Sequence, residues 1–344
     1  MAYLDEGGKM SSDKEACISK LKEYRVLVTG GAGFIGSNLV KELSSIGVKE
    51  LIVIDDFSLK RIAGEQRGLD VLKDVSNLKM INMDAANYKL MYNFIRNANI
   101  DIIFDLAVLP LPLSLKKPKE VFEKNVKIAS VLCELLRKDL YKVLVHFSSS
   151  EVYGSGIYIP MDEEHPLKPS TSYGASKAAQ DLLILSYYLT YGIDARIIRP
   201  FNNVGIGQND FSYSAVIPRT IRRILSCNPP EIFGDGLQTR DFIYVSDTCK
   251  AAVEIASRDE LKGEVINIGS GKETRIIDVI TKICNIMGYN GKILFKQPRP
   301  GDVRRHCADI KKAKRLLNFN PKVSLDEALK IVITWYKSLI KKEG

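Results

Sequence analysis

The sequence predicts an α/β fold in which helices cover both faces of a doubly wound parallel sheet, followed by a smaller C-terminal lobe. The first observation is that short apolar runs alternate with segments of helical periodicity between residues 25 and 200. The second is a glycine-rich turn between the first apolar run and the first helical segment. The third is a change after Arg199, where glycine, asparagine and proline gather and the predicted elements become shorter.

Each predicted strand of the large domain is a short apolar run, the pattern of a strand that is buried on both faces. In chain order these strands are Val26–Thr29, Leu51–Asp55, Lys79–Asp84, Ile102–Val108, Val143–Ser148 and Arg196–Arg199. Between them, apolar residues recur at helical spacing, which indicates the covering helices. These helices are predicted over Phe34–Leu43, Tyr88–Arg96, Val121–Arg137 and Tyr173–Tyr191.

Residues 201–344 are predicted to form mainly the smaller lobe, with segments that cross back to the large domain of residues 25–200. Clefts between two such lobes are where ligands usually bind. Residues 1–24 mix charged side chains with few apolar ones, so we expect a loose N-terminal extension there. The elements predicted in the lobe are Ile217–Leu225, Glu231–Phe233, Phe242–Val245, Glu264–Ile268, Ile276–Met287, Lys292–Phe295 and Leu325–Leu339.

The composition excludes several classes of protein. No run approaches the ~18 consecutive apolar residues of a membrane span. The net charge of +9 comes from basic residues spread along the chain rather than clustered with aromatic ones, so nucleic acid is not the expected partner. The six cysteines contain no CxxC pair, which argues against a metal site or a disulfide framework and favours a reducing cytoplasm.

The strongest local motif is the turn Val-Leu-Val-Thr-Gly-Gly-Ala-Gly-Phe-Ile-Gly over residues 26–36. Gly30, Gly33 and Gly36 join a strand to a helix, where bare backbone lets a pyrophosphate approach the helix N-terminus. Asp55 ends the next predicted strand, and its carboxylate suits the free hydroxyls of an adenosine ribose but would repel a 2′-phosphate. The sequence therefore predicts a Rossmann-type domain that binds NAD rather than NADP.

A second motif concerns proton transfer. Tyr173 and Lys177 are four residues apart, on one face of a predicted helix. An ammonium group and a nicotinamide cation near a tyrosine favour its phenolate, so its pKa falls from ~10 toward neutrality. Such a phenolate can take the proton of a hydroxyl while hydride leaves the same carbon. The segment Ser148–Gly154 ends a strand in hydroxyl groups ahead of this tyrosine.

With these motifs the chain resembles the extended short-chain dehydrogenase/reductases, and among them the NAD-dependent nucleotide-sugar epimerase/dehydratase family, from about Arg25 to Tyr336. The resemblance implies that Ser149, Tyr173 and Lys177 are catalytic. It also implies a site for NAD along the ends of the strands, with Asp84 at the adenine. The residues of this cofactor site are Gly30, Gly33, Phe34, Ile35, Gly36, Asp55, Asp84, Ala85, Ala107, Asn125, Tyr173 and Lys177.

The resemblance further implies that the C-terminal lobe binds the nucleotide sugar. Arg240 and Arg299 resemble the arginines that hold the sugar diphosphate, and Asp302 resembles the acid that binds the nucleoside ribose. Two guanidinium groups suit a pyrophosphate, and a carboxylate suits a diol. Asn202 and Ser114 complete the predicted substrate site. Uridine is the favoured nucleoside, because uridine sugars are the commonest substrates of relatives of this type.

Two departures from the family pattern fall near the predicted sugar pocket. Asp105-Leu-Ala-Val stands where the family often has His-Leu-Ala-Ala, and no basic residue follows until Lys116. Gly205-Ile206 replaces the usual Gly-Pro. The sugar pocket is therefore less well defined by the sequence than the cofactor site is.

The resemblance implies oxidation of the sugar at C4, after which several outcomes remain open. Glu151 stands where dehydratases and uronate decarboxylases carry glutamate, and it could remove the C5 proton of the 4-keto sugar. Ser150, where thymidine-diphosphate-glucose enzymes place an aspartate, is expected near C6. We therefore prefer 4,6-dehydration to a 4-keto-6-deoxy sugar as the reaction. The second alternative is 4-epimerisation of the UDP-glucose/galactose type, and the third is UDP-uronate decarboxylation. A non-catalytic NAD sensor is disfavoured, because no residue of the catalytic trio is missing.

A homodimer is the expected assembly. The helices predicted over Val121–Arg137 and Tyr173–Tyr191 carry more apolar side chains than one sheet face can cover. In relatives of this type such helices pair into a four-helix bundle. The apolar side chains in question include Leu182, Leu183, Leu185, Tyr187 and Tyr188.

Overall fold

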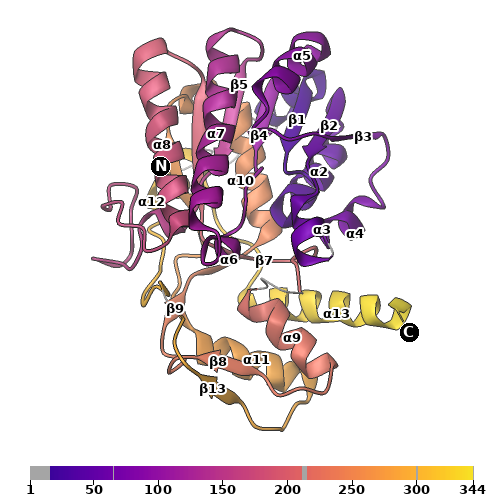
Figure 1. Cartoon of the computed structure of the whole chain (residues 1–344), viewed down its shortest axis with the longest axis vertical. Helices are drawn as coiled ribbons and strands as arrows, with labels where there is room; N and C mark the ends of the chain where they lie inside the picture. The colour runs from indigo at the N-terminus through magenta and orange to yellow at the C-terminus, as the bar shows by residue number, and fades with distance from the viewer. Residues whose placement is uncertain (1–15, 65, 211–214, 300, 344) are drawn as a thin grey trace, which may run out of the picture.

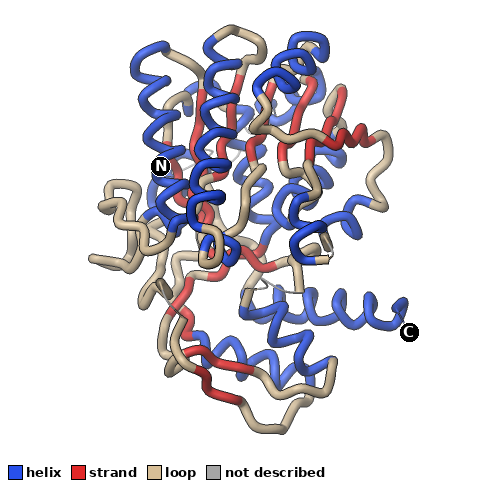
Figure 2. The backbone as a smooth tube through the Cα atoms, viewed as in Figure 1, coloured by secondary structure: helices blue, strands red, loops and turns tan. Residues whose placement is uncertain are grey.

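A seven-stranded parallel sheet forms the central layer of the protein (Figures 1 and 2). The computed structural model describes residues 16–64, 66–210, 215–299 and 301–343. In order across the sheet, the strands are β11 (Val265–Ile268), β6 (Ala195–Pro200), β5 (Val143–Phe147), β4 (Ile102–Asp105), β1 (Arg25–Thr29), β2 (Glu50–Asp55) and β3 (Leu78–Asn82). The strand order reverses between β1 and β4, as it does in a doubly wound sheet. The predicted fold class is confirmed.

Helices cover both faces of this sheet (Figure 1). On one face, α5 (Tyr88–Ala98), α7 (Pro118–Arg137) and α8 (Ser172–Tyr191) share an apolar core with Leu27 of β1. On the other, α2 (Phe34–Ile46), α10 (Val245–Ser257) and α12 (Lys311–Leu317) share a second core with Val26. Successive residues of a strand point to opposite faces, so a strand buried on both sides needs an unbroken apolar run. None of the helices in the described ranges is long and apolar enough to cross a membrane.

Short helices complete the large domain. They are η1 (Lys20–Glu23), α3 (Ser58–Ala63), α4 (Gly68–Leu72), α6 (Leu111–Ser114), η2 (Ser150–Val152) and η3 (Asp259–Leu261). Leu21 of η1 is fully buried in the core that contains α2. Residues 16–24 therefore pack against the large domain, unlike the loose extension expected over residues 1–24, whereas residues 1–15 lie outside the described part of the chain.

The smaller lobe lies below the carboxyl ends of the central strands in Figure 1. Its apolar core is built from α9 (Val216–Leu225), α11 (Ile276–Met287) and α13 (Leu325–Glu343). Three short strand pairs complete it: β7 (Asn202–Val204) with β10 (Phe242–Tyr244), β8 (Glu231–Phe233) with β13 (Leu294–Lys296), and β9 (Thr239–Arg240) with β12 (Thr274–Arg275). Between these elements the chain returns to the large domain as α10, β11 and α12.

The sequence did not predict helix α10, where only a short element over Phe242–Val245 was expected. Eleven of its thirteen residues are buried, because α10 packs between the central sheet and its neighbours α2 and α12. Four of these buried residues, Asp247, Thr248, Glu254 and Ser257, are polar, so polar positions do not mark an exposed face of this helix. A prediction that takes apolar residues as the buried face and polar residues as the exposed face therefore missed it.

A buried arginine of the central sheet holds the C-terminal end of α10. Arg196 of β6 is fully buried, and its Nη1 atom donates to the carbonyls of Ile255 (2.6 Å) and Ala256 (3.0 Å). Its Nε and Nη2 atoms donate to the Asp194 carboxylate at 2.9 and 2.8 Å. The last carbonyls of a helix lack intrahelical partners and carry partial negative charge, so a cation there is favourable. Arg196 thereby fixes α10 against the sheet.

We expect Arg196→Met to lower the free energy of unfolding by about 3 kcal/mol, because it leaves a carboxylate and two buried carbonyls without their donor. Arg275→Met is the matched control: Arg275 makes a similar two-bond pair with Asp278, but in solvent, where such pairs contribute little. Urea denaturation of both variants measures the difference. Equal destabilisation by the two substitutions would contradict this account.

Candidate functional site

The glycine turn after β1 packs too closely for side chains at two of its glycines. Gly30 has a φ of 66°, and a Cβ atom there would lie 2.7 Å from the backbone of Leu106. A Cβ atom at Gly36 would lie 2.3 Å from the Gly30 carbonyl oxygen. Contacts this short would displace backbone, so the turn requires glycine at both positions. Helix α2 can therefore approach the end of β1 directly.

The N-terminus of α2 is open to a ligand. Gly33 precedes the first helical residue, and no side chain caps this end of the helix. The backbone N–H groups of the first turn, from Phe34 and Ile35 onward, have no partner within the helix and carry partial positive charge. A turn of bare backbone that ends in such groups fits a pyrophosphate. The residues predicted for the diphosphate of NAD are thus chemically suited to it.

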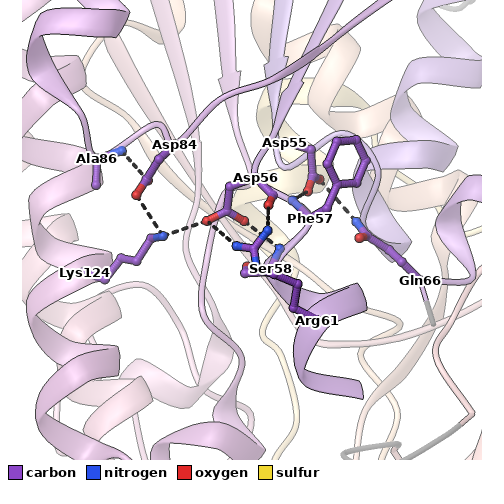
Figure 3. A network of polar contacts seen from close by, with 9 residues as sticks. All are labelled: Asp55, Asp56, Phe57, Ser58, Arg61, Gln66, Asp84, Ala86 and Lys124. Carbon is purple, nitrogen blue, oxygen red and sulfur yellow. Dashed lines mark hydrogen bonds and ion pairs between the residues drawn. The ribbon is translucent and has the colours of Figure 1, made fainter. Parts of the chain in front are cut away.

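Asp55, at the end of β2, is tied to this turn by a hydrogen bond from Ala32. Figure 3 shows its contacts with Phe57 and Gln66. Its Oδ2 atom accepts hydrogen bonds from the Ala32 N–H at 3.0 Å and from Gln66 Nε2 at 3.3 Å, and its Oδ1 atom accepts from the Phe57 N–H at 2.8 Å. Burial raises the pKa of this carboxyl, and the three hydrogen bonds oppose that rise. Because a carboxylate can accept about four hydrogen bonds, part of its capacity is left for a ribose diol.

Beside Asp55, one lysine joins two further carboxylates (Figure 3). Lys124 of α7 donates to Asp56 Oδ2 at 2.7 Å and to Asp84 Oδ2 at 3.0 Å, while Asp84 Oδ1 accepts from the Ala86 N–H at 2.9 Å. Although desolvation lowers the pKa of Lys124, these two carboxylates raise it overall. Ala85, which is also predicted for the cofactor site, is 4% exposed. Sequence reasoning missed Lys124, because a lysine on a helix carries no signal of its partners.

The loop after β4 is held by Asn125 of α7. Asn125 is fully buried, its Oδ1 atom accepts from the Leu109 N–H at 2.8 Å, and its Nδ2 atom donates to the Leu109 carbonyl at 3.2 Å and to Ser176 Oγ at 3.0 Å. In the same loop, the Ala107 N–H donates to Thr29 Oγ1 at 3.3 Å. The amide of Asn125 thus fixes the loop after β4, which lines the predicted cofactor site.

Tyr173 and Lys177 lie in the first two turns of α8, which Thr171 begins by accepting a hydrogen bond from the Gly174 N–H at 3.0 Å. Lys177 is 2% exposed, and its Nζ atom donates to the Phe147 carbonyl at 2.6 Å. Burial lowers the pKa of the Lys177 ammonium group and raises the pKa of Tyr173 to about 12. Both shifts disfavour the charged forms, as desolvation does in general.

Ser149, Ser150 and Glu151 follow β5 and enter the short helix η2. Ser149 caps this helix, because its Oγ atom accepts from the Glu151 N–H at 3.2 Å. An interaction with the Ser149 hydroxyl opposes the rise that burial causes in the pKa of Tyr173. Ser150 is 3% exposed, so its hydroxyl lies largely within the protein. The structure thus brings Ser149 and Tyr173 together.

Glu151 lies between the tyrosine and the smaller lobe. Its negative charge contributes to the raised pKa of Tyr173. Desolvation raises the pKa of Glu151 itself, the charge of Arg240 opposes this rise, and the charge of Asp302 adds to it. A carboxyl group whose pKa is raised toward neutrality can both take and return a proton. Glu151 is therefore chemically suited to act as a base beside the predicted catalytic pair.

The predicted phosphate-binding arginines are engaged within the protein. Arg240 forms an ion pair with Asp302, and its Nη1 atom donates to the Val303 carbonyl at 2.8 Å. The Arg299 guanidinium lies 4.1 Å from the centroid of the Phe233 ring, a cation–π arrangement, and burial lowers its pKa. A bound diphosphate would therefore compete with the Asp302 carboxylate for Arg240.

The two remaining predicted substrate residues differ in their surroundings. The Nδ2 atom of Asn202 is buried and has no hydrogen-bond partner among the described residues. A buried donor without a partner is costly, so this amide favours an added acceptor such as a ligand oxygen or water. The Oγ atom of Ser114 instead donates to the Leu111 carbonyl at 2.7 Å within α6.

Two polar side chains near these residues were not predicted. His306 is fully buried, and neither of its ring nitrogens has a well-formed hydrogen bond within the described ranges. Burial, followed by the charge of Arg240, lowers its pKa to about 3. Gln238 donates to the Phe233 carbonyl at 2.7 Å, whereas its Oε1 atom is buried without a partner in the described part of the chain. Gln238 stands two residues before Arg240, in the segment that carries this arginine, and His306 stands outside any motif singled out in the sequence. Only the fold shows that both side chains are buried near Arg240.

Comparison with known proteins gives the same family for most of the chain. A family described as "NAD dependent epimerase/dehydratase family" matches residues 26–269. The chain is 34% identical to a putative UDP-glucose 4-epimerase of Methanocaldococcus jannaschii, covering 91% of this chain and 98% of that protein. It is 33% identical to a UDP-N-acetyl-alpha-D-glucosaminuronate decarboxylase of Bacillus cytotoxicus, covering 92% and 98%. The crystal structure of DesIV, a dTDP-glucose 4,6-dehydratase of Streptomyces venezuelae with NAD bound, matches with a TM-score of 0.82 and 29% identity over 91% and 97% of the two chains.

We expect Asp55→Asn to weaken NAD binding by about tenfold, because it removes a charged acceptor of the ribose hydroxyls. NADP binding should be unchanged or stronger, since the carboxylate that repels a 2′-phosphate is gone. Titration calorimetry measures the affinities for NAD and for NADP, and their ratio tests the prediction. The substitution Asp139→Asn, at an exposed position, serves as the control. An equal loss of affinity for both cofactors would refute the role assigned to Asp55.

Proposed function

The chain belongs to the NAD dependent epimerase/dehydratase family, and we propose that it oxidises the C4 hydroxyl of a nucleotide-linked hexose and transforms the resulting 4-keto sugar in the same site. NAD is the cofactor, and when bound it accepts hydride from the sugar and later returns it. A uridine diphosphate sugar is the favoured substrate. Arg240 and Arg299 would hold its diphosphate, and the unpartnered amide of Asn202 supports this placement.

Tyr173 removes the proton of the C4 hydroxyl. Burial and the charge of Glu151 raise the pKa of Tyr173 to about 12, so a nearby positive charge must lower it for the tyrosine to act as a base. Lys177, one turn along the same helix, supplies that charge from a buried position. Ser149, whose hydroxyl lies near enough to Tyr173 to lower its pKa, would share the substrate hydroxyl with the tyrosine.

We infer that 4,6-dehydration follows, and the observation that carries this inference is the position of Glu151. Its carboxyl lies close enough to Tyr173 to raise the pKa of the tyrosine, and burial raises the pKa of Glu151 itself. The C4 ketone acidifies the C5 proton, which Glu151 removes. The neutral carboxylic acid then donates this proton to the 6-hydroxyl, which leaves as water. One side chain can therefore serve as base and then as acid.

Product analysis tests this function. Purified protein is incubated with a panel of uridine, thymidine and guanosine diphosphate hexoses, and with a uridine diphosphate uronate, and the products are examined by mass spectrometry and proton NMR. Loss of one water supports 4,6-dehydration, an unchanged mass with inverted C4 indicates epimerisation, and loss of carbon dioxide indicates decarboxylation. Absence of any product or NAD reduction with every sugar would refute the proposed function.

Glu151→Gln keeps the shape of the side chain but removes the base. We expect the variant to reduce NAD with the sugar at nearly the normal rate, yet to form product about 10²–10⁴-fold more slowly. The reduced nicotinamide, followed by its absorbance, should accumulate. Glu164→Gln, at an exposed position in the loop of residues 154–166, is the control. Unchanged product formation by Glu151→Gln would make this glutamate structural and would favour epimerisation.

A 4-epimerase is the second candidate, and the burial of Ser150 favours it. Ser150 is only 3% exposed, and a serine hydroxyl is a weak acid, so the chain offers no separate proton donor for the 6-hydroxyl at that position. An epimerase needs no such donor, because the 4-keto sugar only has to turn its other face toward the cofactor before hydride is returned to C4. Decarboxylation would require a uronate as the substrate. Glu151 is compatible with this reaction too, because uronate decarboxylases carry a glutamate at the same position.

We also propose that the chain forms a homodimer through α7 and α8, which lie side by side (Figure 1). Of the apolar residues predicted for this interface, Leu183, Leu185, Tyr187 and Tyr188 pack partly against the core of their own chain. Leu182 is 60% exposed, and Leu189, two turns further along α8, is 80% exposed. These two side chains form one apolar stripe that a second copy would cover.

The double substitution Leu182→Glu and Leu189→Glu should separate the dimer into monomers, because it buries like charges opposite each other. Sedimentation should give about twice 38.5 kDa for the unmodified protein and 38.5 kDa for the variant. The control Leu90→Glu changes another exposed leucine, on α5, and should leave the mass unchanged. A monomeric unmodified protein at micromolar concentration would rule out the proposed interface.

A further inference from the structure

A cluster of buried charged side chains lies behind Tyr173 and Lys177. It includes Asp105, the residue at which the chain departs from the family pattern. Asp105 is 1% exposed, His146 and Asp181 are fully buried, and Lys177 is 2% exposed. Charged groups are rarely buried to this degree unless they are paired or perform a function. The proposed mechanism does not yet use Asp105, His146 or Asp181.

The sheet and α8 set the geometry of this cluster. The register of β4 and β5 places Asp105 opposite His146, and the Asp105 Oδ2 atom lies 2.8 Å from His146 Nδ1. On the other side of the ring, His146 Nε2 lies 4.0 Å from Asp181 Oδ1. Asp181 follows Lys177 by four residues, as Lys177 follows Tyr173, so the three share one face of the helix. The imidazole ring therefore lies between two carboxylates.

The same carboxylates act on Lys177. Burial lowers the pKa of the Lys177 ammonium group, and the negative charges of Asp105 and then Asp181 oppose this effect. Burial would raise the pKa of Asp105, but the hydrogen bond and charge of His146, the charge of Lys177 and the Thr29 hydroxyl (2.8 Å) together lower it. Asp105 is thus held as a carboxylate, in the form that can stabilise a buried cation.

We propose that Asp105 and Asp181, joined by His146, are positioning residues that keep the buried Lys177 side chain in the charged form that activates Tyr173. The inference rests on the proposed roles of Tyr173 and Lys177. It explains why β4 ends in an acid in this chain: away from water, an ammonium group needs a nearby counter-charge. The imidazole lies between the two carboxylates, 2.8 Å from Asp105 Oδ2 and 4.0 Å from Asp181 Oδ1.

Other titratable groups face this cluster from the surrounding elements. Glu151 acts on Tyr173, and Arg199 of β6 donates to Asp181 Oδ2 at 2.9 Å. Cys133 of α7 and the buried Tyr141 lie near Asp105, and burial raises the pKa of both, so they stay neutral. Asp105 is not among the groups that shift the pKa of Tyr173 directly. We assign its effect on the tyrosine to Lys177, which lies one turn from Tyr173 on α8.

Asp105→Asn in the full-length protein tests this proposal. The substitution keeps the shape of the side chain and removes its charge, so the ammonium pKa of Lys177 falls further and Tyr173 loses part of its activation. We expect the acid limb of the pH profile for single-turnover NAD reduction by UDP-glucose, or by whichever sugar is turned over, to move up by about one pH unit. Stopped-flow absorbance of the reduced nicotinamide gives the profile.

A matched control separates this effect from a loss of structure. Asp247→Asn removes another buried carboxylate, which accepts the Lys322 N–H at 2.9 Å at the start of α10, far along the chain from the cluster. It should lower stability without moving the acid limb. A uniform rate loss in Asp105→Asn with an unshifted limb would mean that Asp105 is merely structural, and would overturn the proposal.

If Asp105→Asn does not fold, Asp181→Asn decides the question in the same way. An asparagine there retains an oxygen for Arg199 and offers an amide donor to His146 Nε2, so folding should be preserved. The acid limb should again move up, and an unshifted limb would overturn the proposal. A failure of the unmodified protein to reduce NAD with any sugar would instead refute the proposed function, and this inference with it.

Discussion

The parallel pairing of β1 with β2 on one side and with β4 on the other is the constraint on which the site depends. This register aligns Thr29 with Ile54 and with Asp105, so three strands end at the same edge of the sheet. The Gly30 N–H then donates to the Ile54 carbonyl at 2.8 Å, which leaves the turn pressed against the backbone that follows β4. Because the turn lies so close to that backbone, it requires glycine. The glycines in turn leave the N-terminus of α2 without a side chain in front of it.

Because helices cover both faces of the sheet, the interior of the site is shielded from water. In such an environment every buried charge needs a counter-charge or a hydrogen bond, and the polar groups must form continuous networks. From Asp181, one such network continues through Arg199 to Tyr153, whose hydroxyl donates to Asn267 Oδ1 at 2.7 Å on β11. The proton chemistry proposed for Tyr173 is therefore embedded in the same buried network that joins the central strands.

The smaller lobe is positioned by the segments that return to the large domain. Asp241, next to Arg240, is fully buried and accepts the N–H groups of Ser270 (2.7 Å), Gly271 (2.9 Å) and Ala308 (3.1 Å). These three groups belong to the chain that follows β11 and precedes α12. Arg240, on the lobe, is thus fixed relative to β11 of the large sheet. That connection brings Arg240 close enough to Glu151 to influence its pKa.

The sequence by itself determined the alternating elements of the large domain, the glycine turn with Asp55, and the pairing of Tyr173 with Lys177. Each of these depends on periodicity or spacing along the chain. Residues that are close in the sequence are enough to reveal such a pattern. Only the tertiary structure decided that α10 is a helix and that Lys124 joins two strand ends. It alone also decided that the Asp105 carboxylate meets His146, 41 residues along the chain. Partners so far apart are chosen by the register of strands and the packing of helices, and a polar residue type does not indicate which distant group it will meet.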